Sequence, residues 1–567
     1  MEAIAVHTDV AVPVAESAAQ PVSSYSLSTL AALESALAEG LQDAWRRVVD
    51  ADPLASLFQT AGWCMPWYRA YADAFDPYVL VVNAGDRVAG VVPMAVDRKT
   101  RELVFASHSM ADYRDIVALP GYREQVVGEL IRHYVEGHFS GALSVGWIDP
   151  ASDTPSLIAK ICAQRGLNHT VRQQPCWRWF PVAGENLQKK FSRIRTHLNY
   201  FKRQGEVTFD VITGAAEWSA FRDEFYRQHS LRQLQAAREV SFDDPRKQRL
   251  YDMLFASPDV PTHVTACRVN GRMIAGHVGL VWRNVLSLGA PSISLEDEQR
   301  SPAVILMAWI IQNAAQLGLS GFDLTIGESE FKRRLGNQCV QLTMVDVYRR
   351  SSTYYRNRAK ARLVSSTRRI VERVAGKDAW EDRIKPTVTA VSHKCGRLRE
   401  LGLVGSIGKA IAITRGQPAR ELSLSIARGA FHSAAKAPSA ASAEIHRNQV
   451  EDLLLWDGDS ASTKAALGAC ARAYGRNRAQ NHTLHTLVAG GALAAWCYSR
   501  IENGRAVIYE VGGTPESGAE ACVALIRQVI GDAFAADADH ADVVLLEAQR
   551  TIRRVLGRDG FRVGTVE

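Results

Sequence analysis

The stretch that decides the fold reads His263-Val-Thr-Ala-Cys-Arg-Val-Asn-Gly-Arg-Met-Ile-Ala-Gly-His-Val-Gly-Leu-Val281. Strand-forming residues flank Asn270-Gly271 on both sides, and an Asn-Gly pair tolerates the positive φ angles of a two-residue hairpin turn. This stretch therefore predicts two antiparallel strands, and a third strand is expected directly after it, over Val285 to Ala290.

The same pattern recurs on both sides of this stretch. Tyr78 to Met94 contains Gly85-Asp86 between two alternating runs, and Arg123 to Gly137 is expected to form the helix that follows. Thr486 to Ser499 is a weaker copy, followed by an expected strand over 506–511, a helix over 519–534 and a strand over 542–547. Repeated units of this kind predict α/β domains with mixed sheets.

Length and composition set the broad class. A chain of 567 residues is expected to hold three or four compact units, and 47% apolar with 22% charged residues excludes bulk disorder. The first 25 or so residues lack the regions of a secretory signal and are interpreted as a loose leader. Apolar runs such as Val304 to Ile311 are too short to cross a bilayer, so a soluble, cytoplasmic protein is expected.

The nine cysteines are scattered along the chain and include no CxxC pair. This distribution favours neither a disulfide framework nor a zinc site, and it predicts reduced thiols that mostly fill cores.

The positive charge is concentrated in one segment. Residues 349–436 contain 20 Lys and Arg against 6 Asp and Glu, whereas the whole chain has a net charge of only +7. Nucleic acid and an anionic membrane surface are both conceivable partners. No nucleic-acid motif accompanies the segment, and helical connectors between domains are often charged for solubility, so nucleic acid is not the favoured partner. The Ser/Ala/Pro tract Ser433 to Glu444 is interpreted as a flexible linker.

A helix with an anion-binding start is expected after the central hairpin. Ser301 is a good N-cap, Pro302 suits the first turn and Gly318 can end the helix. The free N–H groups and positive dipole end of such a helix suit a pyrophosphate, and Arg300 adds a guanidinium fork. Since most helix starts bind no anion, this pattern alone is weak evidence.

Charged residues follow the next expected strand, Gly321 to Ile326, and precede another strand over Gln341 to Tyr348. Ligands of open α/β sheets gather beyond the carboxyl ends of strands, which places Glu328 and Lys332 where an amine and a thioester could meet. The alternatives are a solvated turn and an ion pair of Lys332 with Glu328 or Glu330.

Several of these segments resemble a known family. Phe322 to Gly336 resembles the closing signature of CelD-like acyltransferases, relatives of the Fem peptidyltransferases, and Arg300-Ser301-Pro302 resembles the motif that opens their helix. Lys189 to Gly205 resembles the basic helix of the family's second half, while Phe58-Gln59, Trp63 and the first hairpin resemble its opening half. The resemblance covers residues 55–350.

This resemblance implies two tandem GNAT folds, acyl-CoA as the donor and an amine as the acceptor. The expected division is a leader and N-terminal helix over 1–50, a first GNAT-like half over 51–180, a second half with the acyl-CoA site over 181–350, a basic helical segment and linker over 351–442, and a GNAT-like C-terminal domain over 443–567. The C-terminal domain is predicted to be structural or regulatory, because Glu516 would repel a pyrophosphate.

The implied cofactor-binding residues are Arg300, Ser301, Pro302 and Ala303, although the family commonly has a glycine where Ala303 stands. Direct attack of an amine on a thioester needs alignment and a base but no metal. Glu328 is the first candidate for that base, and His277 the second, since a histidine titrates near neutrality. A histidine on a strand is nevertheless more often a core residue.

Lys332 is the candidate for holding an anionic group or stabilising developing charge. The basic residues Arg193, Arg195, Lys202 and Arg203 form either an anion-binding face or a solvated one.

The function that the resemblance implies is N-acyl transfer from acyl-CoA to an amine on a sugar, amino acid or polysaccharide precursor, in envelope or exopolysaccharide biosynthesis. Two alternatives remain open. One is an inactive GNAT scaffold or regulator in such a pathway, and the other is a Fem-like transferase that uses aminoacyl-tRNA as its donor.

Overall fold

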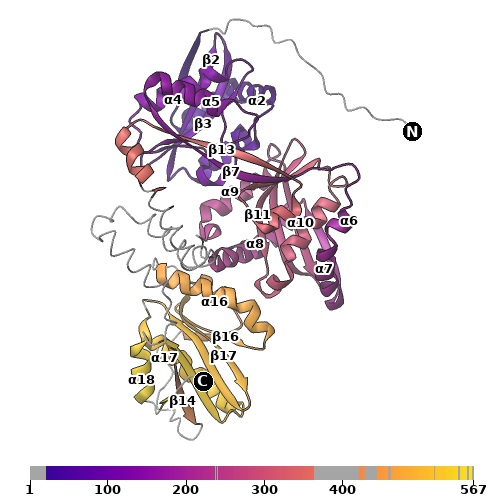
Figure 1. The fold of residues 1–567 in the computed structure, drawn as a ribbon, viewed down its shortest axis with the longest axis vertical. Coiled ribbons are helices and arrows are strands. Elements are labelled where there is room, and N and C mark those ends of the chain that lie inside the picture. The colour runs from indigo at the N-terminus through magenta and orange to yellow at the C-terminus, as the bar shows by residue number, and fades with distance from the viewer. Residues whose placement is uncertain are drawn as a thin grey trace. The chain divides into compact units, whose positions relative to one another are not determined.

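The computed structural model describes residues 21–236, 238, 240–359, 361–362, 365, 421–427, 443–456, 461–515, 517–546, 549–558 and 561–564 (Figure 1). The chain divides into two compact units, of which the first comprises residues 1–177, 325–328 and 339–355. The second comprises residues 178–324, 329–338 and 356–567. Most of the basic segment over 349–436, including its interpretation as a helical connector, lies outside the described residues.

The first unit is built on an antiparallel sheet. Its two long strands, β2 (Phe75–Ala84) and β3 (Arg87–Asp97), are joined by the predicted turn, in which Gly85 has a φ of 58°. The strand order is β1-β2-β3-β4, and β5 pairs with β3. The remaining strands are β1 (Val22–Leu27), β4 (Leu103–Phe105) and β5 (Val117–Ala118).

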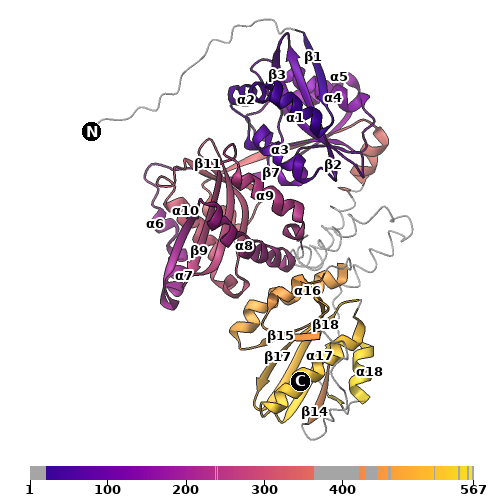
Figure 2. The same cartoon turned by 180° about the vertical axis from the view of Figure 1, so that it is seen from behind.

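Residues 22–25, which were interpreted as the end of a loose leader, lie in the first strand of this sheet, whereas residues 1–20 lie outside the described residues. Val22–Leu27 forms β1, which pairs antiparallel with β2 from Val22 opposite Ala84 to Leu27 opposite Val79, and is seen from behind in Figure 2. The side chains alternate between more and less buried positions, which is the pattern of a strand with one covered face.

Helices pack on this sheet around a core that includes Leu80, Val92, Val126 and Leu130. Gly90 lets α4 approach β3, because a Cβ there would collide with the side chain of Val126. The helices are α1 (Leu30–Ala36), α2 (Gln42–Ala51), α3 (Ala61–Ala70), α4 (Arg123–Glu136) and α5 (Thr154–Arg165).

A strand from much later in the sequence completes the first unit. β13 (Gln338–Tyr348) pairs antiparallel with β6 (Leu143–Ile148), with Val345 opposite Val145, and precedes β7 (Asn168–Trp179) in the strand order. Ser144 Oγ donates a 2.6 Å hydrogen bond to Asp346 Oδ1 across this pair. The first half of the chain therefore needs residues from the second to complete its core.

The second unit begins with a five-stranded part in the order β12-β11-β10-β9-β8. The predicted hairpin is confirmed: Asn270 and Gly271 adopt φ angles of 48° and 79° between β9 and β10. The strands are β8 (Val207–Ile212), β9 (Thr262–Val269), β10 (Arg272–Trp282), β11 (Val285–Ile293) and β12 (Gly321–Ile326).

Helices contact both faces of this part. Phe221 and Phe225 of α8 share a core with Val264 and Val278. Trp309 of α10 stacks on Phe209 of β8, with ring centroids 5.0 Å apart. The helices are α6 (Leu187–Lys190), α7 (Ser192–Gln204), α8 (Ala215–Gln235), α9 (Pro245–Ala256), α10 (Pro302–Gln312) and α11 (Glu330–Leu335).

The C-terminal sheet repeats the order of elements seen around β10, with the strand order β15-β16-β17-β18-β19-β14-β20. Its hairpin turns at Gly490 and Gly491, whose φ angles are 59° and 79°. The elements are β14 (Glu421–Ala427), β15 (Ala443–Arg447), α16 (Ala461–Ala479), β16 (Thr483–Ala489), β17 (Ala492–Glu502), β18 (Arg505–Gly513), α17 (Gly518–Ala535), β19 (His540–Leu546), α18 (Arg550–Arg558) and β20 (Arg562–Gly564).

Two strands of this sheet come from sequence that was interpreted differently. Glu421–Ala427 was placed in the basic helical segment but forms β14, which pairs with β19 and β20. Its alternating Leu and Ser side chains explain the strand. Ala443 and Glu444, the end of the predicted linker tract, begin β15.

α16 connects the C-terminal sheet to the rest of the second unit. Leu467 and Tyr474 of α16 share a core with Leu234 of α8 and with Leu295. Gly468 and Gly475 lie at this contact, where added Cβ atoms would collide with the carbonyl oxygens of Leu234 and Leu295. The two glycines therefore allow a close approach of α16 to these backbones.

The described helices are each too short or too polar to span a lipid bilayer. The eight described cysteines are free thiols, and all except Cys339 are buried. The mixed α/β fold class predicted from the sequence is confirmed by this order of elements.

Candidate active site

The candidate site lies where β11 and β12 separate. The two strands pair in parallel from Val285 opposite Gly321 to Ser287 opposite Asp323, and β11 continues to Ile293 without pairing to β12. A β-bulge between Val278 and Leu280 lies beside this point. Beyond this point the edge of β11 that faces β12 makes no backbone hydrogen bonds to that strand, so an extended chain that carries amide groups can bind there.

The loop from β11 to α10 is held by its acidic residues. It includes the 3₁₀ helix η5 (Leu295–Arg300). Asp297 of η5 pairs with Arg272 of β10 at 2.8 Å, and Glu298 of η5 accepts a short hydrogen bond from Gln235 of α8. Arg478 of α16 pairs with Glu296 at 3.3 Å. The loop that precedes α10 is therefore anchored from both the central and the C-terminal sheets.

Ser301 occupies the N-cap position of α10, but its hydroxyl makes no capping hydrogen bond. The residue adopts the left-handed conformation, with a φ of 52°, which directs its side chain away from the first turn. Its carbonyl accepts from the N–H groups of Val304 at 2.9 Å and Ile305 at 3.3 Å. The prediction of the position is confirmed, while the predicted side-chain cap is wrong.

The start of α10 offers few donors to an anion. Pro302 has no N–H, and Val304 already bonds to Ser301. Ala303 is half-buried, and within the described residues its N–H is the one first-turn donor that makes no hydrogen bond. An anion bound here would depend on that single N–H, the helix dipole and neighbouring cations.

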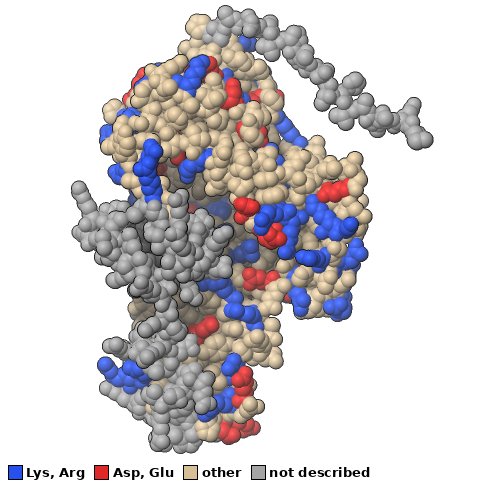
Figure 3. Space-filling view, viewed as in Figure 1, with Lys and Arg blue, Asp and Glu red and all other residues tan. Residues whose placement is uncertain are grey.

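Arg300 supplies the nearest cation. Its guanidinium lies 4.2 Å from the ring centroid of Tyr200 on α7, so the exposed side chain is oriented by a cation–π contact. Arg193, Arg195, Lys202 and Arg203 on α7 are also exposed, and Figure 3 shows Lys and Arg gathered over α6 and α7. The exposed face of α7 is therefore basic.

Glu328 and Lys332 follow β12 in the sequence. Glu328 is exposed in the turn, and Lys332 is half-buried on α11, a short helix that contacts α10. Ser329 caps α11 by accepting a 3.2 Å hydrogen bond from the Lys332 N–H. Glu330 pairs with Arg333 at 2.7 Å and with Arg334 at 3.0 Å.

His277 lies inside the sheet. Its side chain is fully buried, and neither ring nitrogen has a hydrogen-bond partner in the described chain. Burial, with a smaller contribution from His263, lowers the pKa of His277 to about 3, so the imidazole is neutral at physiological pH. This environment is that of a core histidine, and a role as base stays a prediction.

Sequence reasoning missed two residues at the point where the strands separate. Asp323 is buried, and its Oδ2 lies 3.2 Å from Nε of Arg178. The one feature of the sequence that could have indicated Asp323 is its carboxylate in a strand without other charged residues. Tyr200, which orients Arg300, gave no signal, because only the fold brings α7 beside α10.

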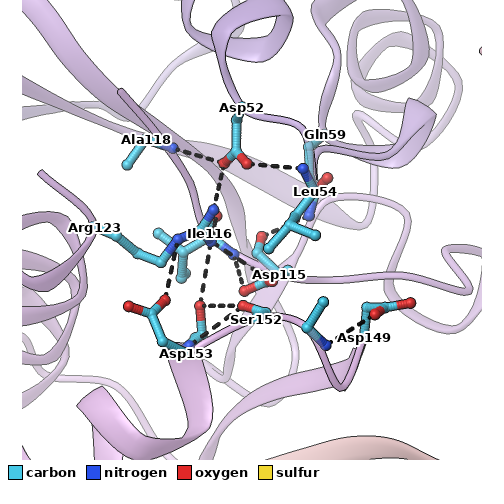
Figure 4. Close-up of polar contacts among 12 residues, drawn as sticks. Asp52, Leu54, Gln59, Asp115, Ile116, Ala118, Arg123, Asp149, Ser152 and Asp153 are labelled. Carbon is cyan, nitrogen blue, oxygen red and sulfur yellow. Dashed lines mark hydrogen bonds and ion pairs between the residues drawn. The ribbon is translucent and has the colours of Figure 1, made fainter. Parts of the chain in front are cut away.

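The matching place in the first unit, the start of α4, is filled by side chains (Figure 4). Arg123 pairs with buried Asp52 at 2.7 Å, donates to the Ile116 carbonyl at 2.5 Å, and lies 3.6 Å from Asp115 and 3.4 Å from Asp153. Burial raises the pKa of Asp115. Three carboxylates around one guanidinium leave no place for a phosphate here.

Comparison with known proteins assigns the class of the central domain. The acetyltransferase (GNAT) domain family matches residues 188–333. This region contains β8 to β12, α10 and the candidate site. The chain therefore contains a GNAT-type acetyltransferase domain.

The solved structures that resemble the chain are distant. FemX is 12% identical, with a TM-score of 0.40 over 54% of this chain and 95% of that one. The C-terminal domain of a putative lysylphosphatidylglycerol synthetase from Agrobacterium fabrum is 13% identical, with a TM-score of 0.38 over 54% and 90%. A tandem GNAT protein from the clavulanic acid biosynthesis pathway is 11% identical, with a TM-score of 0.35 over 57% and 98%. No curated protein matches the chain.

Proposed function

We propose that the central domain transfers an acyl group from acyl-CoA to an amine. The observation that carries this proposal is the separation of β11 from β12, together with exposed Arg300 just before α10, a helix that contacts β11. An extended chain bound along the edge of β11 would lead from a reacting thioester to a phosphate-bearing end near Arg300. Ala303 and Lys332 are the further residues that this proposal places at the donor.

The bound donor supplies an activated thioester carbonyl. Glu328, which follows β12, is the proposed base: its carboxylate takes a proton from the acceptor amine as nitrogen attacks the carbonyl carbon. The carbon–sulfur bond breaks, the amide forms, and the departing thiolate receives the proton that Glu328 took from the amine, which returns Glu328 to its carboxylate form. Lys332 is proposed to stabilise negative charge during this exchange. His277 is the weaker candidate for the base, since it is fully buried.

The resemblance to CelD-like acyltransferases supports an acceptor amine on a sugar, amino acid or polysaccharide precursor. The corresponding pathway would be envelope or exopolysaccharide biosynthesis, and the reaction would take place in the cytoplasm. No metal is required by the proposed chemistry.

One observation favours a second donor. Of the described residues at the start of α10, Ala303 alone offers an unbonded N–H, and the neighbouring helix face is basic. This arrangement suits an extended polyanion at least as well as a compact pyrophosphate. An aminoacyl-tRNA donor is therefore the alternative transferase, and an inactive scaffold is the alternative without catalysis.

The first test is calorimetric titration of the full chain with acetyl-CoA and longer acyl-CoAs. Micromolar binding that is lost in Arg300→Ala but kept in Arg268→Ala would support the proposal, because Arg268 pairs with Asp210 at 2.9 Å on another strand. Absence of binding to every acyl-CoA would overturn it. Salt-dependent binding of RNA would then favour the aminoacyl-tRNA donor. Absence of RNA binding would favour the inactive scaffold.

The second test addresses the base. Glu328→Gln should lower turnover by about a hundredfold and leave donor binding nearly unchanged, because only proton transfer is removed. Glu330→Gln is the matched control two residues away, where the carboxylate pairs with Arg333 and Arg334. Equal turnover in the Glu328 variant and the unaltered enzyme would remove Glu328 from the mechanism.

A further inference from the structure

A second strand pair separates in the C-terminal domain, and this one encloses a cavity. β18 and β19 pair in parallel from Arg505 opposite His540 to Ile508 opposite Val543 and then diverge. A cavity of about 470 Å³ opens there, within the range of small-molecule sites. Its polar and charged lining includes Asn477, Arg500, Tyr509 and Glu510.

Two polar atoms of this lining are buried without a hydrogen-bond partner in the described residues, Nδ2 of Asn477 and Nε of Arg500. Asn477, near the end of α16, is 9% exposed, and its Nδ2 donates to no acceptor in the described residues. A buried amide donor without an acceptor costs about 1 to 3 kcal/mol, so such groups are usually found where a ligand or water supplies the acceptor. The unsatisfied amide of Asn477 therefore indicates that the cavity binds a ligand with a hydrogen-bond acceptor.

The charged groups of the lining have both signs. Arg500 lies 6.0 Å from the ring centroid of Tyr509, and its Nε is 3.4 Å from the half-exposed carboxylate of Glu502, a contact that contributes little at the surface. Glu510, exposed at the cavity with a φ of 51°, supplies negative charge. A ligand with one anionic and one cationic end matches these charges.

The other lining groups fix where the two ends can bind. Tyr509 and His482 share a short hydrogen bond and so satisfy each other. Gln549 Nε2 donates to the Val511 carbonyl at 2.8 Å. Val507, Val511, Val544 and Leu545 offer apolar surface to an uncharged portion of the ligand.

The start of the neighbouring helix argues against a nucleotide thioester in this cavity. Ser517, the N-cap of α17, donates its hydroxyl to the Ala494 carbonyl at 2.6 Å, and the first turn carries Glu520. A carboxylate in the first turn competes with a phosphate for the helix dipole. Glu516, which the sequence singled out for this reason, lies outside the described residues.

We propose that this cavity binds a small zwitterion of amino-acid or dipeptide size with apolar side chains. Its carboxylate would bind Arg500 and the amide of Asn477, its ammonium would lie beside Glu510, and its side chains would contact the four apolar residues. The C-terminal domain would thus be a ligand-binding domain, independent of whether the central domain uses acyl-CoA.

The test is calorimetric titration of the full chain with L-leucyl-L-leucine. Arg500→Gln and Asn477→Leu should each weaken binding by about tenfold or more, since each removes a donor to the carboxylate. Arg505→Gln is the matched control, because Arg505 begins the neighbouring strand β18, is not part of the cavity lining and pairs with Asp542. Binding should also fall when the dipeptide is N-acetylated or amidated at its C-terminus.

Three results would overturn the proposal. The first is no binding of the dipeptide up to about 10 mM, the weak limit of specific sites of this size. The second is equal binding of the end-blocked dipeptides, which would show that the charges are not recognised. The third is displacement of the dipeptide by acetyl-CoA in Arg300→Ala, which would assign the cavity to a thioester instead.

Discussion

The starts of α4 and α10 occupy matching places in their sheets but have opposite chemistry. At α4, the guanidinium of Arg123 turns inward and is held by Asp52, with Asp115 and Asp153 nearby. At α10, the guanidinium of Arg300 stays exposed and lies over Tyr200. One arginine completes a buried network, and the other is presented to solvent.

This difference shows that two domains with the same order of elements need not share an anion-binding site. Both helices follow a hairpin and precede a strand, so their backbones offer the same positive dipole end. Whether a ligand can use it depends on what the adjacent side chains do. In the first unit carboxylates neutralise that end, whereas in the central domain the acids of η5 are paired away from it.

The largest effect is expected from removing the inward arginine. Arg123→Ala would leave Asp52, which is 2% exposed, without its cation, and should lower the free energy of unfolding by about 3 to 5 kcal/mol. Denaturant titration measures this loss. Arg98→Ala, which breaks a surface pair with Asp76, should cost less than about 1 kcal/mol. Similar costs for both variants would contradict the structural role of Arg123.

The next largest effect is expected from acid, which should lower the stability of the central domain through its buried histidines. Burial lowers the pKa of His277 to about 3 and of His263 to about 4, below the value of about 6.5 in an unfolded chain. Their contribution to stability is complete above pH 6.5 and is lost as the pH falls toward the folded values. Between pH 7 and 5, each should cost about 2 kcal/mol.

His277→Leu tests this assignment, because it removes one titrating imidazole from the core. Unfolding of the central domain, followed from pH 7 to 5, should become less pH-dependent in this variant. A pH dependence identical to that of the unaltered protein would show that His277 is not the group that titrates.

A smaller effect is expected at the outward arginine. Tyr200→Leu removes the ring that orients Arg300 and should weaken acyl-CoA binding about threefold. In an Arg300→Ala background the same change should have no effect, because the contact is already absent. Titration of the four proteins measures the coupling, and additive losses would mean that Tyr200 acts without Arg300.

The smallest effect concerns the methyl group of Ala303. Ala303→Gly should tighten acyl-CoA binding about twofold if the Cβ limits the approach of a phosphate to the N–H, with a stability loss below about 1 kcal/mol. Competition binding at equal ionic strength measures the change. Weaker binding in the glycine variant would contradict the view that Ala303 hinders the donor.

Local signals in the sequence predicted the hairpins well. Asn270-Gly271 and Gly85-Asp86 lie in the turns where they were expected, and the helix predicted over 519–534 corresponds to α17. These features depend on residues that are neighbours in the chain. β1 and β14 were missed because short, half-polar strands resemble loops until a partner strand is known.

The candidate site was predictable only in part. The position of Ser301 at the start of α10 followed from cap and proline preferences, but its left-handed backbone did not. The Arg123 network, the stacking of Arg300 on Tyr200 and the cavity beside β18 each join residues far apart in sequence. Such long-range contacts arise from packing, which no local pattern encodes.

The pairing of β13 with β6 has a consequence during synthesis of the chain. The edge of β6 is complete as a template soon after residue 148 leaves the ribosome, yet its partner ends only at Tyr348. At 5 to 20 residues per second, that edge would stay open for about 10 to 40 s. An open strand edge pairs readily with other chains, so the nascent protein is exposed to aggregation during this interval. We therefore expect ribosome-associated chaperones to bind it.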